Sequence, residues 1–208
     1  MLQIIPALLV AITVVIQCLA VQMSRYRLSR MNARPPHHGL ALMSGMLAAA
    51  AIILRLYQND SAVGVLFMTI MTGCMTLMTL TDAASCRLPR PFTIMYLISG
   101  SAFRLWQGDW LTGLCSAGFW LLLLLLFRQY TSYRRKTETI GLGDVFLIAG
   151  IAIWSPPGDI PWIVATAAGG ALLYLWCNRQ RRITRELPFG PFLCASQYAF
   201  TFYPGGLW

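Results

Sequence analysis

The sequence predicts an all-α fold, a polytopic membrane helix bundle of about eight transmembrane helices. Of the 208 residues, 57% are hydrophobic and only 11% are charged, whereas soluble domains carry roughly 25% charged residues. Long apolar segments recur with short polar joints between them, and the basic residues gather in alternate joints. These three observations predict one integral-membrane domain, residues 1–208, with no soluble domain attached.

The expected spans follow from the length of each apolar segment, since a full crossing takes roughly 20 residues. Segment 142–154 is short for this purpose, unless the irregular backbone beside it also lies at membrane depth, where surrounding protein makes it tolerable. Residues 1–22 lack a basic start and a small-residue cleavage site, so we expect a retained span and not a secretory signal. The eight spans are expected at about 2–22, 39–57, 63–81, 91–107, 110–127, 142–154, 160–177 and 189–207.

The basic residues predict the orientation. Fourteen of the 16 Lys and Arg residues follow the first, third, fifth and seventh spans, and the opposite loops carry none. The positive-inside rule places those four loops in the cytoplasm and both termini outside. The two remaining residues, Arg55 and Arg104, fall near outer span ends, where we expect their side chains to snorkel to the interface. The net charge of +9 therefore predicts contact with membrane lipids and excludes nucleic acid, which needs a basic patch on a soluble face.

The same topology sorts the seven acidic residues. Five have ordinary roles in the loops, as solvated turn residues outside the membrane or as ion-pair partners in the basic cytoplasmic loops. These five are Asp60, Asp109, Asp159, Glu138 and Glu186. The other two, Asp82 at the end of the third span and Asp144 at the start of the sixth, are expected at the cytoplasmic side and at similar depth. A charge in such a place is costly, which makes it a candidate functional residue.

Two carboxylates that share a site hold one proton between them, because a like charge disfavours the second ionisation. The ionised one can deprotonate a water, and the protonated one can polarise a peptide carbonyl, as in aspartic proteases. The helix dipoles favour Asp144, at a helix N-terminus, as the anion, whereas Arg87 and Arg90 beside Asp82 oppose that bias. The simpler alternatives are a glycine turn with a capping Asp144 and an ion pair between Asp82 and Arg87.

Glycine and proline surround this pair. Gly141 and Gly143 precede Asp144, and glycine permits both close backbone approach and unusual dihedral angles. A third element, Pro188-Phe189-Gly190-Pro191, opens the last span. Its two prolines are expected to prevent a regular helix start and to leave backbone groups free for an extended substrate. A simple proline-started helix is the alternative.

These elements together resemble the type IV prepilin peptidases, a branch of the GxGD intramembrane aspartic proteases (peptidase family A24). The resemblance covers residues 63–208 and leaves 1–62 as two additional helices joined by a short basic loop. It implies that Asp82 and Asp144 are the catalytic pair. By position it also implies supporting roles for Leu88, Pro89, Gly141, Gly143, Pro188, Gly190 and Pro191.

The resemblance implies an aspartic endopeptidase of the bacterial inner membrane. Its substrates would be type IV prepilins or type II secretion pseudopilins, whose short basic leader is cut after a glycine at the cytoplasmic face. Two residues depart from the family pattern: Phe146 stands where many relatives have Lys, and Arg90 where Asn is common. Loop 23–38 also lacks the paired cysteines linked to N-methylation in many relatives, so we expect neither methyltransferase activity nor S-adenosylmethionine nor zinc.

Two alternatives remain open from the sequence. Another GxGD protease, acting on preflagellins or signal peptides, would use the same pair of acids. A small proton-coupled transporter would use membrane acids as a relay, but such acids usually lie near the midplane between repeated halves. Here both acids are expected at one face, and no internal repeat is evident.

Overall fold

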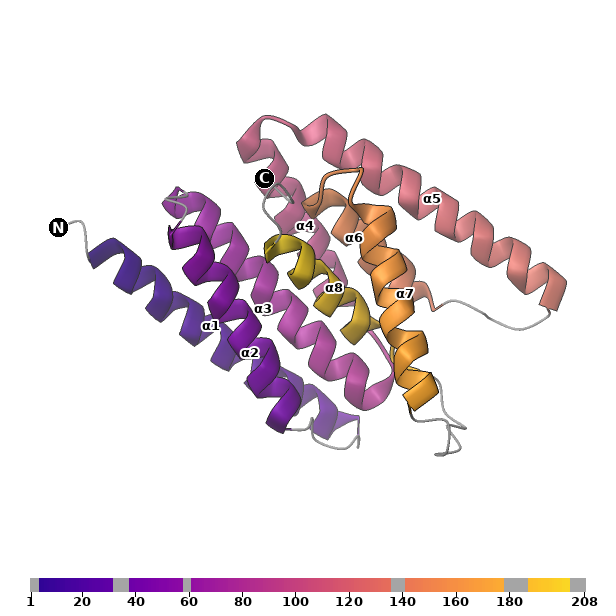
Figure 1. Ribbon diagram of the computed structural model, residues 1–208, viewed down its shortest axis with the longest axis horizontal. Coiled ribbons are helices and arrows are strands. Elements are labelled where there is room, and N and C mark those ends of the chain that lie inside the picture. The colour runs from indigo at the N-terminus through magenta and orange to yellow at the C-terminus, as the bar shows by residue number, and fades with distance from the viewer. Residues whose placement is uncertain (1–3, 32–37, 58–60, 136–140, 178–186, 203–208) are drawn as a thin grey trace.

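The predicted helix bundle is confirmed. A computed structural model describes residues 4–31, 38–57, 61–135, 141–177 and 187–202, and this part of the chain contains eight helices and no strand (Figure 1). The helices are α1 (Ile4–Arg30), α2 (His38–Tyr57), α3 (Ala62–Ser85), α4 (Arg90–Gln107), α5 (Trp110–Arg135), α6 (Leu142–Trp154), α7 (Ile160–Cys177) and α8 (Gly190–Phe202).

Most helix boundaries agree with the expected spans, and the exceptions have one cause. Helices α1 and α5 each continue eight residues beyond the apolar segment, into sequence that was expected to form loops. A drop in hydropathy marks the end of the lipid-facing part, but Arg, Gln and Tyr continue a helix without penalty comparable to Gly or Pro. The end of the last expected span, 203–207, lies outside the described residues.

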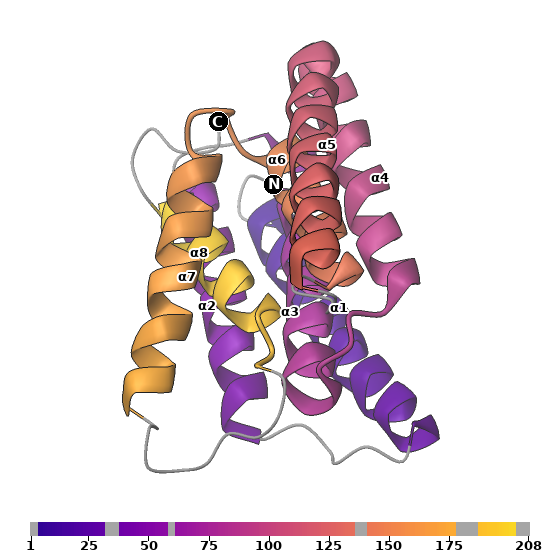
Figure 2. The same ribbon diagram turned by 90° about the vertical axis from the view of Figure 1, so that its right-hand side faces the viewer.

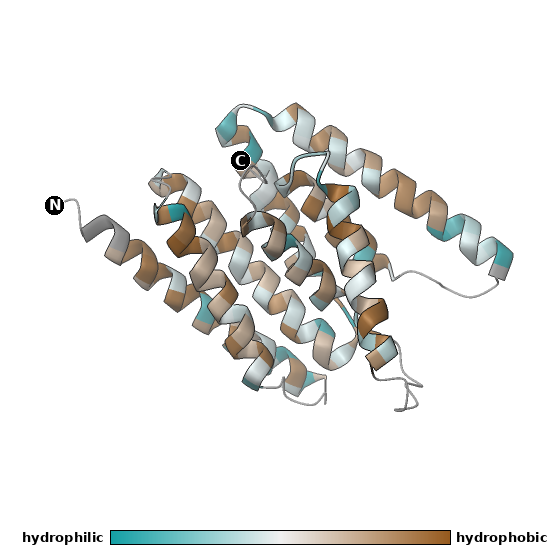
Figure 3. Cartoon of the chain, in the orientation of Figure 1, coloured by the Kyte–Doolittle hydropathy of each residue, from teal (hydrophilic) through white to brown (hydrophobic). Residues whose placement is uncertain are grey.

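Five helices among the described residues are long and apolar enough to cross a membrane, namely α1, α2, α3, α5 and α7. The outer faces of several of these helices carry apolar residues along much of their length (Figure 3). On α5, for example, Leu114, Phe119, Leu122 and Leu126 are exposed. Such faces suit contact with lipid chains, which supports a polytopic membrane protein.

Two helices organise the bundle. Helix α3 contacts α1, α2, α4 and α8, and α6 contacts α4, α5, α7 and α8. Helices α1 and α2 lie on one side of this centre, and α5 and α7 lie on the other (Figures 1 and 2). Helix α6 has only 13 residues, about 20 Å at 1.5 Å per residue. All its residues from Val145 to Trp154 are buried except Phe146, so this short segment is surrounded by protein, as the sequence requires of it.

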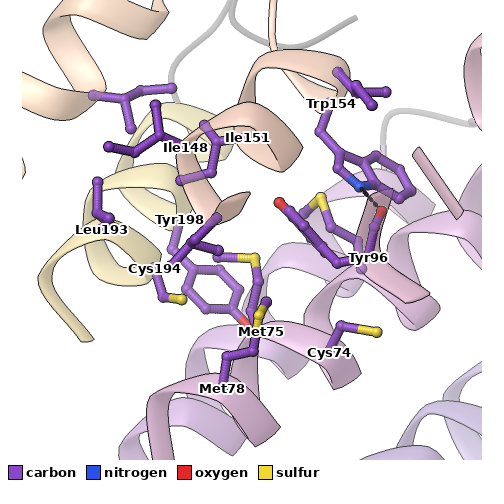
Figure 4. Packing of buried hydrophobic residues seen from close by; sticks show 14 of the residues in the cluster. Cys74, Met75, Met78, Tyr96, Ile148, Ile151, Trp154, Leu193, Cys194 and Tyr198 are labelled. Carbon is purple, nitrogen blue, oxygen red and sulfur yellow. Dashed lines mark hydrogen bonds between the residues drawn. The ribbon is translucent and has the colours of Figure 1, made fainter. Parts of the chain in front are cut away.

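The core around α6 combines close packing at glycine with buried side chains such as Tyr96 and Trp154, which lie side by side in Figure 4. Gly100 of α4 faces Trp154, and a methyl group there would lie 2.7 Å from the indole nitrogen. Gly150 of α6 likewise faces the ring of Tyr96. The indole N–H of Trp154 donates to the Tyr96 carbonyl at 3.1 Å, and the Tyr96 hydroxyl donates to Gln197 Oε1 at 2.6 Å. These contacts tie α4 to α6 and α8.

The expectation that Arg55 and Arg104 snorkel to the interface is wrong. Their side chains are buried, with only 6% and 7% of the residue exposed. Arg104 turns inward because α6 ends beside it: Nε donates to the Ile153 carbonyl at 2.8 Å and an Nη donates to the Ser155 carbonyl at 3.0 Å. The unpaired carbonyls of a helix C-terminus are good partners for a cation.

Several residues used to predict the orientation lie outside the described part of the chain. They are Arg34, Lys136, Arg179, Arg181, Arg182, Arg185, Asp60, Glu138 and Glu186. Arg25, Arg27 and Arg30 are described and lie in the last turns of α1, at the bundle end where α3 also ends (Figure 1). The cytoplasmic placement of that end stays a prediction.

Candidate active site

Asp82 lies in the last turn of α3 and is almost fully buried, with 4% exposed. Its Oδ2 accepts a hydrogen bond from the backbone N–H of Gly190, the first residue of α8, at 2.8 Å. A methyl group on Gly190 would lie 2.7 Å from the same oxygen. Gly190 is therefore required so that the start of α8 can reach the carboxylate, 108 residues away in sequence.

The start of α8 is more regular than the sequence suggested. The Phe189 carbonyl accepts from the N–H of Phe192 at 3.1 Å and of Leu193 at 3.2 Å, as in an ordinary first helical turn. The expectation of a disrupted start, with backbone left free for a substrate, is wrong at Gly190, whose N–H already binds Asp82. Pro188 and Pro191 flank this contact and do not line the cavity described below.

Asp144 is the third residue of α6 and is half-buried. Gly141 is the N-cap residue, with an ordinary φ of −65°, so the unusual dihedral angle that glycine would permit is not used. The carboxylate lies back over Gly141, where a methyl group would be 3.2 Å from Oδ2. This position puts the negative charge at the partly positive N-terminus of α6, although no side chain caps the helix.

Gly143 packs against the first residue of the Leu88-Pro89 element. A methyl group on Gly143 would lie 2.7 Å from Cβ of Leu88, so the start of α6 packs directly against the segment that follows α3. Pro89 is the N-cap of α4, and it sets the direction in which the chain leaves Leu88. The close approach at Gly143 is made to Leu88, and the predicted approach of this backbone to an extended substrate stays a prediction.

Asp82 and Asp144 line one cavity of about 290 Å³, between the end of α3, the start of α4 and the start of α6. Of the supporting residues expected from sequence, Leu88, Gly141 and Gly143 also line the cavity, and Gly190 reaches it through Asp82. The other lining residues are Cys86, Arg87, Arg90, Thr93, Leu142 and Phe146.

Two of these lining residues had no role in the sequence prediction. Cys86 caps α3 with a φ of 50°, a left-handed conformation that is uncommon outside glycine, and no glycine marks the position. Thr93 lies on α4, one turn after the Leu-Pro element, and gives no motif signal. From the sequence, Phe146 was noted only as a departure from the family pattern. In the structure it lines the cavity.

Two carboxyl groups that line one cavity are capable of acid–base chemistry. One carboxylate can take a proton from water while the other, protonated, donates to the carbonyl oxygen under attack. Arg87 and Arg90 bring positive charge to the rim, where both are exposed. Among the described residues, no group of three or more His, Cys, Asp or Glu side chains is placed to hold a metal ion.

Comparison with known proteins shows the family of this chain. Residues 69–176 match the model of the type IV leader peptidase family, a segment that includes both Asp82 and Asp144. The chain belongs to this family. The recognition made from the three sequence elements is thus confirmed, whereas Gly190 and the whole of helices α1 and α2 lie outside the matched segment.

Two curated relatives support the same assignment. The chain is 30% identical over 174 residues to a "Prepilin leader peptidase/N-methyltransferase" of Burkholderia pseudomallei strain 1026b, and equally to that of strain K96243. The match covers 79% of this chain and 53% of each relative, so the chain spans about half the length of the curated relatives it matches. No solved structure matches the chain.

Proposed function

We propose that this family member is an aspartic endopeptidase of the bacterial inner membrane that removes the basic leader from type IV prepilins or type II secretion pseudopilins. The observation that carries the proposal is the shared cavity of Asp82 and Asp144, which come from two helices and meet at one end of the bundle. The names of the relatives support a prepilin substrate. A transporter is disfavoured by family membership and by the position of both acids at one end.

In the proposed reaction, Asp144 is the better candidate for the base. It lies at the N-terminus of α6, which favours the anion. The Gly190 N–H donates to Oδ2 of Asp82, and this hydrogen bond favours the ionised form of Asp82, against the bias of the dipole. With Asp144 as the base, Asp82 donates its proton to the scissile carbonyl from Oδ1. Attack of the deprotonated water then gives a tetrahedral intermediate, and return of a proton to the leaving nitrogen breaks the peptide bond.

The proposed topology suits such a substrate. If the arginine-rich loops are cytoplasmic, the cavity opens at the face where a basic leader is retained and where the apolar substrate helix enters the membrane. Cleavage after the glycine that joins leader and helix would then occur without unfolding the helix. We propose no N-methyltransferase activity and no need for S-adenosylmethionine or zinc, because loop 23–38 contains no cysteine.

The test is leader removal in cells that express Asp82→Asn or Asp144→Asn together with a prepilin and a pseudopilin. Each variant is expected to lose cleavage by about 10³-fold, the typical contribution of positioned acid–base groups. Asp159→Asn, an acid at the opposite end of the bundle, is the matched control and should cleave normally. Normal leader removal by either stably expressed active-site variant would refute the aspartic mechanism.

A further inference from the structure

A second cavity, far from the two aspartates, lies between α1 and α2 and has a volume of about 590 Å³. Much of its lining is apolar or small. On α2 these residues include Ala41, Gly45 and Ala49, which recur every fourth position and so share one face. Gly45 has open space beside it, with nothing within 4 Å of where a methyl group would stand. This α1–α2 groove is thus a lateral opening, lined on one side by small residues.

One end of the groove carries a cationic pair. Arg25 of α1 and His38 of α2 both line it, and the guanidinium lies 3.2 Å from His38 Nδ1. A guanidinium can only donate, so Nδ1 is the acceptor and the neutral imidazole carries its proton on Nε2. The pair then offers only donors to a ligand. His38 is also the first residue of α2, where the helix dipole favours an anion.

The charge at one end of the groove, together with its length, favours a lipid over a helix. From His38 to Ala49 along α2 is about 16 Å, at 1.5 Å per residue. This is close to one leaflet, half of a hydrocarbon core about 30 Å thick. Small residues at this spacing also suit a partner helix, but an apolar partner helix would leave the donors of Arg25 and His38 without an anion. An acyl chain with an anionic headgroup needs only one leaflet and a cation at its end.

We propose that the α1–α2 groove binds an anionic phospholipid, with its phosphate at Arg25 and His38 and one acyl chain along Ala41, Gly45 and Ala49. The ligand enters from the leaflet on the side of Asp82 and Asp144. This site is independent of the peptidase chemistry and lies on two helices that are entirely outside the matched family segment.

Bound lipid would brace the active-site end of the bundle through α1. Gln17, which lines the groove, donates to Thr72 of α3 at 3.2 Å. Two residues beyond Arg25, the guanidinium of Arg27 lies over the ring of Phe92 in α4, 4.6 Å from its centre. Helix α1 therefore joins the groove to α3 and to the start of α4, where the catalytic cavity begins.

The experiment measures binding to the purified full-length protein in detergent, by native mass spectrometry and by thermal unfolding. The probes are phosphatidylglycerol, phosphatidylcholine with the same acyl chains, and glycerol 3-phosphate. We expect preferential binding of phosphatidylglycerol and a rise in unfolding temperature with that lipid. Arg25→Gln and His38→Gln should each weaken binding, Arg25→Gln by about five-fold, the contribution of one basic residue near an anionic surface.

Gly45→Leu should abolish binding, because Gly45 lines the groove and nothing lies within 4 Å of where a Cβ would stand. Two matched controls should bind as the wild type does. Arg30→Gln changes an arginine of the same helix end whose guanidinium lies over the Tyr26 ring. Cys115→Leu fills a cavity of similar size, about 600 Å³, that α5 lines on the other side of the bundle.

Three outcomes would overturn the proposal. Equal binding of phosphatidylcholine, or undiminished binding by Gly45→Leu, would mean that no specific groove site exists. Binding of glycerol 3-phosphate as strong as that of the lipid would indicate an anion site without an acyl-chain component. A dimer that is lost in Gly45→Leu but unaffected by lipid would show that a second copy of the chain occupies the groove.

Discussion

A charged side chain lies inside the bundle at each end of α6, Arg104 of α4 at one end and Asp144 of α6 at the other. Their surroundings differ. At the C-terminal end, the Arg104 guanidinium has three partners, the carbonyls of Ile153 and Ser155 and the Asp109 carboxylate at 3.4 Å. At the N-terminal end, Asp144 is half-buried beside a second acid and opens to a cavity. A charge surrounded by partners stabilises the fold, whereas one that faces an open cavity and a like charge is available for chemistry.

The largest effect is expected at Asp144, where a substitution should reduce activity without reducing stability. Asp144→Asn should lose leader cleavage by about 10³-fold and unfold at the same or a higher detergent concentration than the wild type, because Asp82 can then ionise without a second acid facing it. Parallel cleavage assays and sodium dodecyl sulfate titrations measure the two quantities. An Asp144→Asn variant that loses cleavage activity and stability to the same extent would show that Asp144 has a structural role.

The opposite result is expected at the other end. Arg104→Met should lower the free energy of unfolding by about 3 kcal/mol, because it leaves two buried carbonyls without a donor. The folded fraction should cleave substrate normally. Arg104→Lys is the matched control and should recover part of the loss, since an ammonium can restore one of the contacts. Wild-type stability of Arg104→Met would contradict a structural role for the guanidinium.

A smaller effect is expected from the packing at the start of α6. Gly143→Ala should cost about 2 kcal/mol of stability, within the range for overpacked sites, because the new methyl group would lie 2.7 Å from Leu88 Cβ. Gly118→Ala, in α5 with nothing within 4 Å, is the control and should be neutral or slightly stabilising. Equal behaviour of the two variants would remove the packing reason for Gly143.

The smallest effect should come from Asp109. Its side chain is 51% exposed and lies 3.4 Å from Arg104, so Asp109→Asn is expected to change the free energy of unfolding by less than about 1 kcal/mol, as is usual for exposed ion pairs. The two carbonyl contacts of Arg104 would remain. A loss as large as that of Arg104→Met would show that the ion pair, and not the end of α6, holds the guanidinium.

Sequence patterns were reliable where one local property decides the outcome. The starts and ends of α4, α6 and α7 follow from changes in hydropathy and from Gly and Pro at the joints. They were less reliable for α1 and α5, where polar residues continue the helix past the apolar segment. The prediction for Arg104 failed because its partners are carbonyls at the end of another helix, about 50 residues away.

The sequence by itself determined the helical membrane fold, the family and the two candidate aspartates, because hydropathy, charge distribution and short motifs are properties of neighbouring residues. Only the tertiary structure decided what each glycine contacts: Gly143 meets Leu88, and Gly190 meets Asp82. It also decided that Asp82 and Asp144 share a cavity while Arg104 is enclosed. Packing of helices far apart in sequence sets these contacts, and no local pattern encodes which carbonyl, carboxylate or methyl group a side chain will meet.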